Sequence, residues 1–134
     1  MNKLNHAKHN ERVCNFLSKK EDFTDWIVTT SFYSAIHFVD HKIFPFEESG
    51  LKFNTIEQYF TYWKANDFPS MDKHSIRVNL VERLCSEISI PFSWLRSQCY
   101  TARYHQYSYT RPRETSNQAK QYLKKIKDYC TKES

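Results

Sequence analysis

Turn-forming residues are scarce in this chain, which has one glycine and four prolines among its 134 residues. An all-β sandwich or barrel needs a turn about every 8–12 residues, and glycine and proline supply many of those turns. The single glycine, Gly50, also cannot build a glycine-rich phosphate-binding loop. We therefore expect an all-α protein. Its length predicts one domain over residues 1–134, since domains usually hold ~100–200 residues.

Apolar residues that recur every three or four positions predict an antiparallel bundle of five or six helices and no strand. The clearest helix covers about residues 22–44, begins at Asp22 or Thr24 and ends before Pro45. It is apolar on nearly every side, so we expect it to lie at the centre of the bundle. The other helices are expected over about 3–19, 54–64, 70–90, 91–104 and from 115 onward, with loops over 45–53 and 106–113.

Capping residues predict where three of these helices begin. Asn54 with Glu57, and Thr115 with Gln118, match the spacing of a capping box, and Ser70 or Asp72 can cap the helix between them. That middle helix has apolar residues at spacing four and is expected to stop at Ile90 and Pro91: Ile76, Leu80, Leu84 and Ile88.

The four cysteines are far apart in the sequence, and each lies within an apolar helical pattern: Cys14, Cys85, Cys99 and Cys130. Zinc sites and disulfide frameworks need clustered or paired spacings. We therefore expect buried free thiols, which favour a reducing cytoplasmic location. The sequence also has no signal peptide and no run of ~18 apolar residues, so we expect no membrane contact.

Two histidine pairs have the spacing that places both rings on one helix face: His6 with His9, and His37 with His41. A metal site needs a third ligand, and the neighbouring Asp40 points away from His41 on a helix. We expect neither a metal nor another cofactor.

Basic residues are concentrated in the second half of the chain. Residues 71–134 contain twelve Lys and Arg against six Asp and Glu, a net charge of +6, whereas residues 1–70 contain eight against nine, a net charge of −1. Four tyrosines are interleaved with this basic excess: Tyr100, Tyr104, Tyr107 and Tyr109. Positive charge beside aromatic rings is typical of a surface that contacts phosphates and stacks bases. The alternative is an ordinary solvated face.

Six polar residues occupy segments whose periodicity otherwise predicts burial: Asp25, His37, His74, Arg77, Arg103 and Tyr104. Leaving such a group buried without a partner costs about 1–3 kcal/mol. Two interpretations remain open. The residues form structural pairs, such as Arg103 with Asp25, or they line one cleft that holds a phosphate.

Three motifs carry a resemblance to a known family. Residues 25–37, DWIVTTSFYSAIH, resemble the core-helix pattern D-W-x-V-T-x-x-F-Y-x-A-x-H of a group of small bacterial proteins in the HEPN (higher eukaryotes and prokaryotes nucleotide-binding) superfamily. His74 to Arg77 is similar to that group's H-x-x-R, and Ala102 to Tyr104 to its A-R-Y. The motifs come in the same order, and the similarity spans roughly residues 4–105.

The resemblance implies a helical bundle with a four-helix core that is often dimeric, and an association with RNA in toxin–antitoxin, abortive-infection or CRISPR-linked defence. Active members are metal-independent ribonucleases with an Arg-x4–6-His motif. No arginine here is followed by a histidine at that spacing; the nearest approach is Arg103 with His105.

We therefore expect a module that binds RNA or a nucleotide in a bacterial defence or toxin–antitoxin system. One alternative is a divergent ribonuclease that uses Arg103 and His105. Another is a protein–protein or dimerisation module without nucleic-acid contact, with an antitoxin-like protein as partner. The 16% share of aromatic residues is high for a small monomer, so we also expect a homodimer.

Overall fold

A computed structural model of the chain describes residues 2–19, 23–104 and 111–132, apart from the side chains of Arg103 and Tyr104. Of these described residues, 78% are helical, which confirms the all-α class. The elements, in chain order, are α1 (Lys3–Leu17), α2 (Thr24–Ile43), β1 (Phe46–Glu48), β2 (Leu51–Phe53), α3 (Ile56–Ala65), α4 (Lys73–Leu84), the 3-10 turn η1 (Ser86–Ile88), α5 (Ser89–Tyr104) and α6 (Pro112–Cys130). Among the described residues, none of the helices has the length and apolar character needed to cross a membrane.

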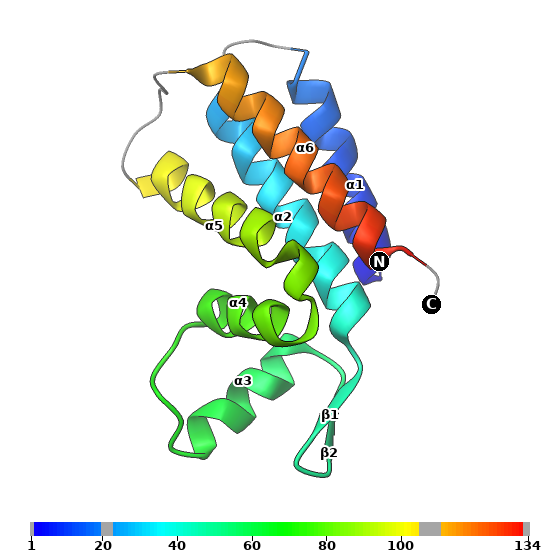
Figure 1. Ribbon diagram of the computed structural model, residues 1–134, viewed down its shortest axis with the longest axis vertical. Helices are drawn as coiled ribbons and strands as arrows, with labels where there is room; N and C mark the ends of the chain where they lie inside the picture. Colours follow the sequence, from blue (N-terminus) through cyan, green and yellow to red (C-terminus); the bar gives the residue numbers. More distant parts are fainter. Residues whose placement is uncertain (1, 20–22, 105–110, 133–134) are drawn as a thin grey trace.

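The molecule has two regions, a bundle and a smaller end region (Figure 1). Helices α1, α2, α5 and α6 form the bundle, and α2 packs against each of the other three. The β1–β2 hairpin, α3 and α4 make up the end region, residues 46–84. Thirteen of the twenty residues of α2 are buried, which confirms it as the central helix. Trp26 is an exception on this helix, with 56% of its surface exposed.

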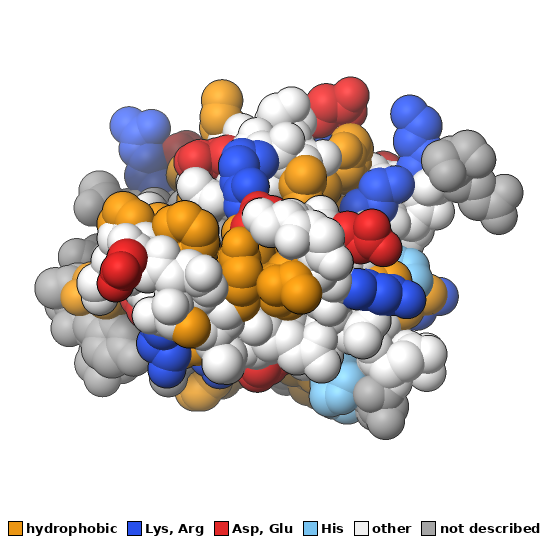
Figure 2. Space-filling model, turned by 90° about the horizontal axis from the view of Figure 1, so that it is seen from below, with side chains coloured by type: hydrophobic (Ala, Val, Ile, Leu, Met, Phe, Trp, Pro, Cys, Tyr) orange, Lys and Arg blue, Asp and Glu red, His pale blue; other side chains and the backbone are white. Residues whose placement is uncertain are grey.

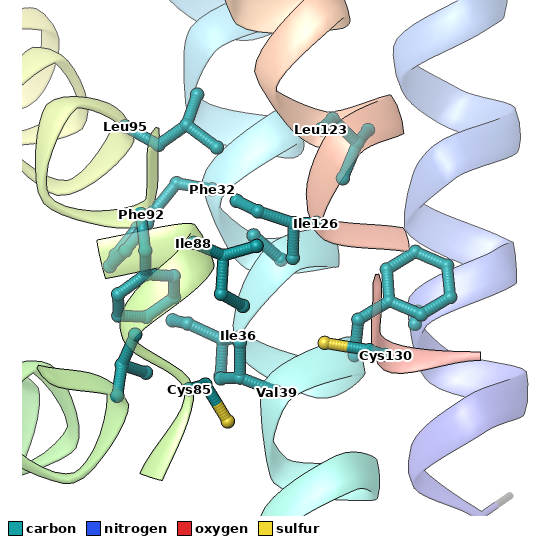
Figure 3. Packing of buried hydrophobic residues seen from close by; sticks show 14 of the residues in the cluster. Phe32, Ile36, Val39, Cys85, Ile88, Phe92, Leu95, Leu123, Ile126 and Cys130 are labelled. Atoms are coloured by element: carbon teal, nitrogen blue, oxygen red, sulfur yellow. The ribbon is translucent and has the colours of Figure 1, made fainter. Parts of the chain in front are cut away.

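The core of the bundle is apolar (Figure 3). It brings together side chains from all four bundle helices and from η1, among them Phe32, Ile36 and Val39 of α2, Ile88, Phe92 and Leu95 of η1 and α5, and Leu123 and Ile126 of α6. All four cysteines are buried free thiols, as the sequence predicts. Burial raises the pKa of Cys130 to about 12, so this thiol stays protonated and unreactive at neutral pH.

Residues 45–53 are not the loop that the sequence predicts, because they contain a short antiparallel hairpin. Phe46 pairs with Phe53, and the turn residues Ser49 and Gly50 have φ angles of 53° and 78°. Two successive positive φ angles are those of the tight turn whose twist matches a two-residue hairpin. The expectation of no strand is therefore wrong for six residues. Phe46 and Phe53 then pack on Tyr59 of α3, which anchors the hairpin to the end region.

Several helix ends differ from those that the capping patterns predict. Thr55 caps α3 in place of Asn54, and its side chain accepts a hydrogen bond from the backbone N–H of Gln58. Asp72 caps α4, as one of the two predicted candidates. Helix α6 begins at Pro112 instead of Thr115, since proline fits the first turn, where no N–H is needed.

The end of α4 also comes earlier than expected. The helix stops at Leu84, and the chain turns through η1 before α5 begins at Ser89. This turn buries Cys85 and Ile88 but leaves Leu84 47% exposed, so Leu84 is not part of the core. Pro91 lies in the first turn of α5, where the sequence places it.

Candidate functional site

The two segments that contain the first and last helices carry a large excess of positive charge. The described residues 2–19 and 111–132 contain eleven Lys and Arg against three Asp and Glu, a net charge of +8. The described stretch between them, residues 23–104, contains eight against nine, a net charge of −1. Although 94 residues separate the two helices in sequence, α1 and α6 lie side by side in the bundle (Figure 1).

The charges of α1 and α6 form two stripes. On α1, Lys8, Arg12, Asn15 and Lys19 recur at intervals of three or four residues, which places them along one side of the helix or its extension. On α6, the corresponding stripe has the same spacing and consists of Arg113, Asn117, Lys120, Lys124 and Lys127. We call the two stripes together the basic face.

A shallow groove of about 300 Å³ lies between the two stripes, lined by Glu11, Asn15, Lys120, Leu123, Lys124, Lys127 and Asp128. The Lys127 ammonium lies 2.9 Å from the Glu11 carboxylate and joins α6 to α1 across it. Lys124 lies 2.8 Å from Asp128 on its own helix. These two pairs offset part of the charge at the groove, and the excess of lysine and arginine around it remains.

Three of the sequence-predicted site residues meet at a different place, between α2 and α4. His37 of α2 and both His74 and Arg77 of α4 lie around Asp40, a residue that sequence analysis considered only as a metal ligand. Arg77 donates to Asp40 through Nε at 2.8 Å and through Nη2 at 3.0 Å. Both residues are only 6% exposed. This is a structural pair of the kind considered for Arg103 and Asp25, formed by two other residues.

The two histidines beside this ion pair are half-buried. His74 Nδ1 lies 3.5 Å from Nη1 of Arg77, and the His37 ring is 4.8 Å from that of His6 on α1. Burial lowers the pKa of both His37 and His74. The neighbouring His6 lowers the pKa of His37 further, and Arg77 does the same for His74. Both imidazoles therefore favour the neutral form in the folded protein.

The other predicted site residues do not join this cluster in the described part of the chain. Asp25 lies in the first turn of α2, fifteen residues before Asp40 and therefore about 22 Å away along the helix. The side chains of Arg103 and Tyr104, and all of His105, fall outside the described residues. The cleft made of all six residues thus stays a prediction, as does the ribonuclease alternative.

No metal site is found among the described residues, where no three His, Cys, Asp or Glu side chains come together as ligands. The two histidines of the pair His37 and His41 lie in different environments, since His37 is half-buried and His41 is exposed.

Comparisons of the chain with family models, with curated proteins and with solved structures found no match. The resemblance to HEPN proteins therefore stays a prediction.

Sequence analysis missed two features of the site. The basic face does not show in the net charges of the two halves of the chain. In the first half, the acidic residues of α2 and the hairpin cancel the basic residues of α1. The helical spacing of Lys8, Arg12 and Lys19 was the available signal. Asp40 was missed because nothing local in the sequence says which arginine, 37 residues away, will pair with it.

Proposed function

We propose that the protein associates with single-stranded RNA through the basic face. The observation that carries this proposal is the net charge of +8 on residues 2–19 and 111–132, which contain two adjacent helices, in a molecule whose total net charge is +5. Nucleic-acid backbones bind surfaces where lysine and arginine collect on one side. The side amides of Asn15 and Asn117 lie within the same stripes and add donors for phosphate or ribose oxygens.

The basic face by itself favours a polyanion, and the resemblance to HEPN proteins is the reason for choosing RNA. The same resemblance supports a place in a bacterial defence or toxin–antitoxin system. Binding that rests on phosphate contacts needs no catalytic group, so the proposal is independent of the ribonuclease alternative.

The test is a binding titration with a fluorescently labelled single-stranded RNA, followed by anisotropy at several salt concentrations. The logarithm of the binding constant should fall linearly with the logarithm of salt, by about 0.7 for each phosphate contact. Lys8→Glu combined with Lys124→Glu reverses one charge in each stripe and should weaken binding strongly. It should also reduce the salt slope by about 1.4, for two lost contacts.

The matched control is Lys52→Glu combined with Lys64→Glu, which changes the net charge by the same amount but on exposed positions of β2 and α3. This variant should bind RNA nearly as well as the natural chain. Equal losses in the two variants would mean that only net charge matters, and would overturn the proposal. The same titration with a DNA strand of the same sequence shows whether the ribose 2′-hydroxyl contributes to binding.

A further inference from the structure

The end region contains a pocket that lies away from the basic face. It has a volume of about 380 Å³ and lies between the hairpin, α3 and α4. We call it the aromatic pocket; its lining residues are Glu48, Ser49, Tyr59, Tyr62, Trp63, Phe68, Asn79 and Arg83. Figure 2 views this end of the molecule and shows hydrophobic side chains gathered near its centre, with charged side chains of both signs around them.

Aromatic rings form the walls of the aromatic pocket. Phe68 packs on Trp63 with 4.7 Å between ring centroids and on Tyr62 with 6.0 Å. Tyr62 in turn is stacked on the buried Tyr59 at 5.8 Å. Phe68 remains 40% exposed and Tyr62 and Trp63 are half-buried, so ring surface is accessible to a ligand. Such walls favour a flat ligand that can stack.

A chain of polar groups holds one edge of the pocket in place. Arg83 donates from Nη1 to Glu48 at 3.0 Å, from Nη2 to the Tyr59 hydroxyl at 3.0 Å and from Nε to the Asn79 side-chain oxygen at 2.9 Å. Tyr59 also donates to Glu48 at 3.0 Å. These bonds hold the Glu48 carboxylate, the Arg83 guanidinium and the Asn79 side-chain amide beside one another. This edge of the pocket therefore presents both hydrogen-bond acceptors and donors to a ligand.

The charge of the surroundings limits the kind of ligand. Glu48 and Arg83 offset each other within the pocket, and residues 46–84 as a whole contain five Lys and Arg against six Asp and Glu, a net charge of −1. A phosphate group gains little electrostatic stabilisation in such surroundings, and a cationic ligand would be repelled by Arg83. An uncharged ring with donors and acceptors on its edge fits all three properties of the pocket: its aromatic walls, its polar edge and its nearly neutral surroundings.

We propose that the aromatic pocket binds an uncharged planar heteroaromatic ring of the nucleobase class, stacked on Tyr62 and Phe68 and read at its edge by Glu48, Arg83 and Asn79. The site is separate from the basic face and goes beyond the proposed association with RNA, because it requires no phosphate contact.

The test uses the full chain and the fluorescent nucleoside 2-aminopurine riboside, whose emission is quenched when the base stacks. Saturable quenching is expected, together with displacement by at least one of adenosine, guanosine, cytidine and uridine. Because the ligand is uncharged, the binding constant should not change between about 50 and 200 mM salt, a range over which phosphate-driven binding falls steeply. The 5′-monophosphate of the same nucleoside should bind no more tightly than the nucleoside.

Phe68→Ala removes one stacking wall at a position that is 40% exposed, and the melting temperature of the variant reports any loss of stability. It should weaken nucleoside binding at least about fivefold, the size of one lost base–ring contact. Asn79→Ala should weaken binding and change the preference among the four nucleosides. The matched control is Phe16→Ala, which removes an aromatic ring that is 64% exposed on α1 and should leave binding unchanged.

Three results would overturn the proposal: no saturable quenching at millimolar nucleoside, binding that Phe68→Ala leaves unchanged while the melting temperature is also unchanged, or a monophosphate that binds more than about tenfold more tightly. The Lys8→Glu, Lys124→Glu variant separates this proposal from the proposed function, since it should lose RNA and keep the nucleoside.

Discussion

The bundle and the end region of this molecule are built in different ways. The bundle is held by apolar side chains that three helices and η1 place around α2, and its outer helices α1 and α6 carry the charge. The end region also buries aliphatic residues, but it adds stacked aromatic rings and hydrogen bonds among ionised groups, and it is nearly neutral. Most charged side chains of α1 and α6 are therefore exposed, whereas in the end region Glu48 and Arg83 are hydrogen-bonded to one another and to Tyr59.

This difference indicates two classes of ligand. A surface with an excess of lysine and arginine suits a polyanion, whereas a part-buried aromatic pocket with paired charges suits a neutral ring. The Asp40–Arg77 pair links the two regions, because Asp40 belongs to α2 of the bundle and Arg77 to α4 of the end region.

Asp40→Ala should have the largest effect on stability. It leaves the Arg77 guanidinium buried without its carboxylate, which costs about 3–5 kcal/mol of unfolding free energy for a pair of this kind. Urea denaturation followed by circular dichroism measures the loss. The control is Asp40→Leu with Arg77→Leu, which buries no charge and should be far more stable than the single variant. A single variant as stable as the natural chain would show that the link is dispensable.

Tyr59→Phe should weaken the end region by about 1–3 kcal/mol, since the hydroxyl bonds to an ionised carboxylate and a guanidinium. Tyr62→Phe is the matched control on the same helix, because its hydroxyl makes only a 3.4 Å exposed contact with Ser49. Hydrogen exchange of the α3 amides measures the difference between the variants. Equal exchange rates in both would mean that ring packing alone holds this region together.

The two regions also differ in how well the sequence predicts them. Helical periodicity and the scarcity of glycine are sufficient to predict the bundle, because burial of α2 repeats along its whole length. The hairpin escapes such patterns, since each strand has only three residues and both strands contain charged side chains, and the available signal is the pair Ser49–Gly50 between them. The predicted residues His37, His74 and Arg77 do meet, but their partner Asp40 depends on how α2 and α4 pack.

Asp72→Ala should cost about 1 kcal/mol by removing the cap of α4, in which the carboxylate accepts from the Ser75 N–H at 2.7 Å. That hydrogen bond also lowers the pKa of Asp72 below its usual 3.8. The stabilisation is therefore complete above the unfolded-state pKa and is lost as the pH falls through the lower folded-state value. Asp72→Asn should keep the cap without this acid sensitivity. If the difference in melting temperature between the aspartate and asparagine forms stayed the same from about pH 6 to about pH 3, the carboxylate would not contribute through its charge.

The smallest expected effect is that of His37 and His74 on the pH dependence of unfolding. Burial lowers the pKa of both rings in the folded protein, so the unfolded chain takes up protons more readily. Their contribution is therefore present above about pH 6.5 and is lost as the pH falls below that value. His37→Gln with His74→Gln should flatten the change in stability between about pH 7 and pH 5. His9→Gln with His41→Gln, at two exposed positions, is the control and should leave it as it is.

The most direct test of the two-region account is a nuclear magnetic resonance titration of the isotope-labelled protein with single-stranded RNA. The account predicts that the largest amide shifts lie on α1 and α6, and that raising the salt concentration reverses them. Shifts confined to residues 46–84 that persist in high salt would contradict it, because the RNA would then be held by the end region without the basic face.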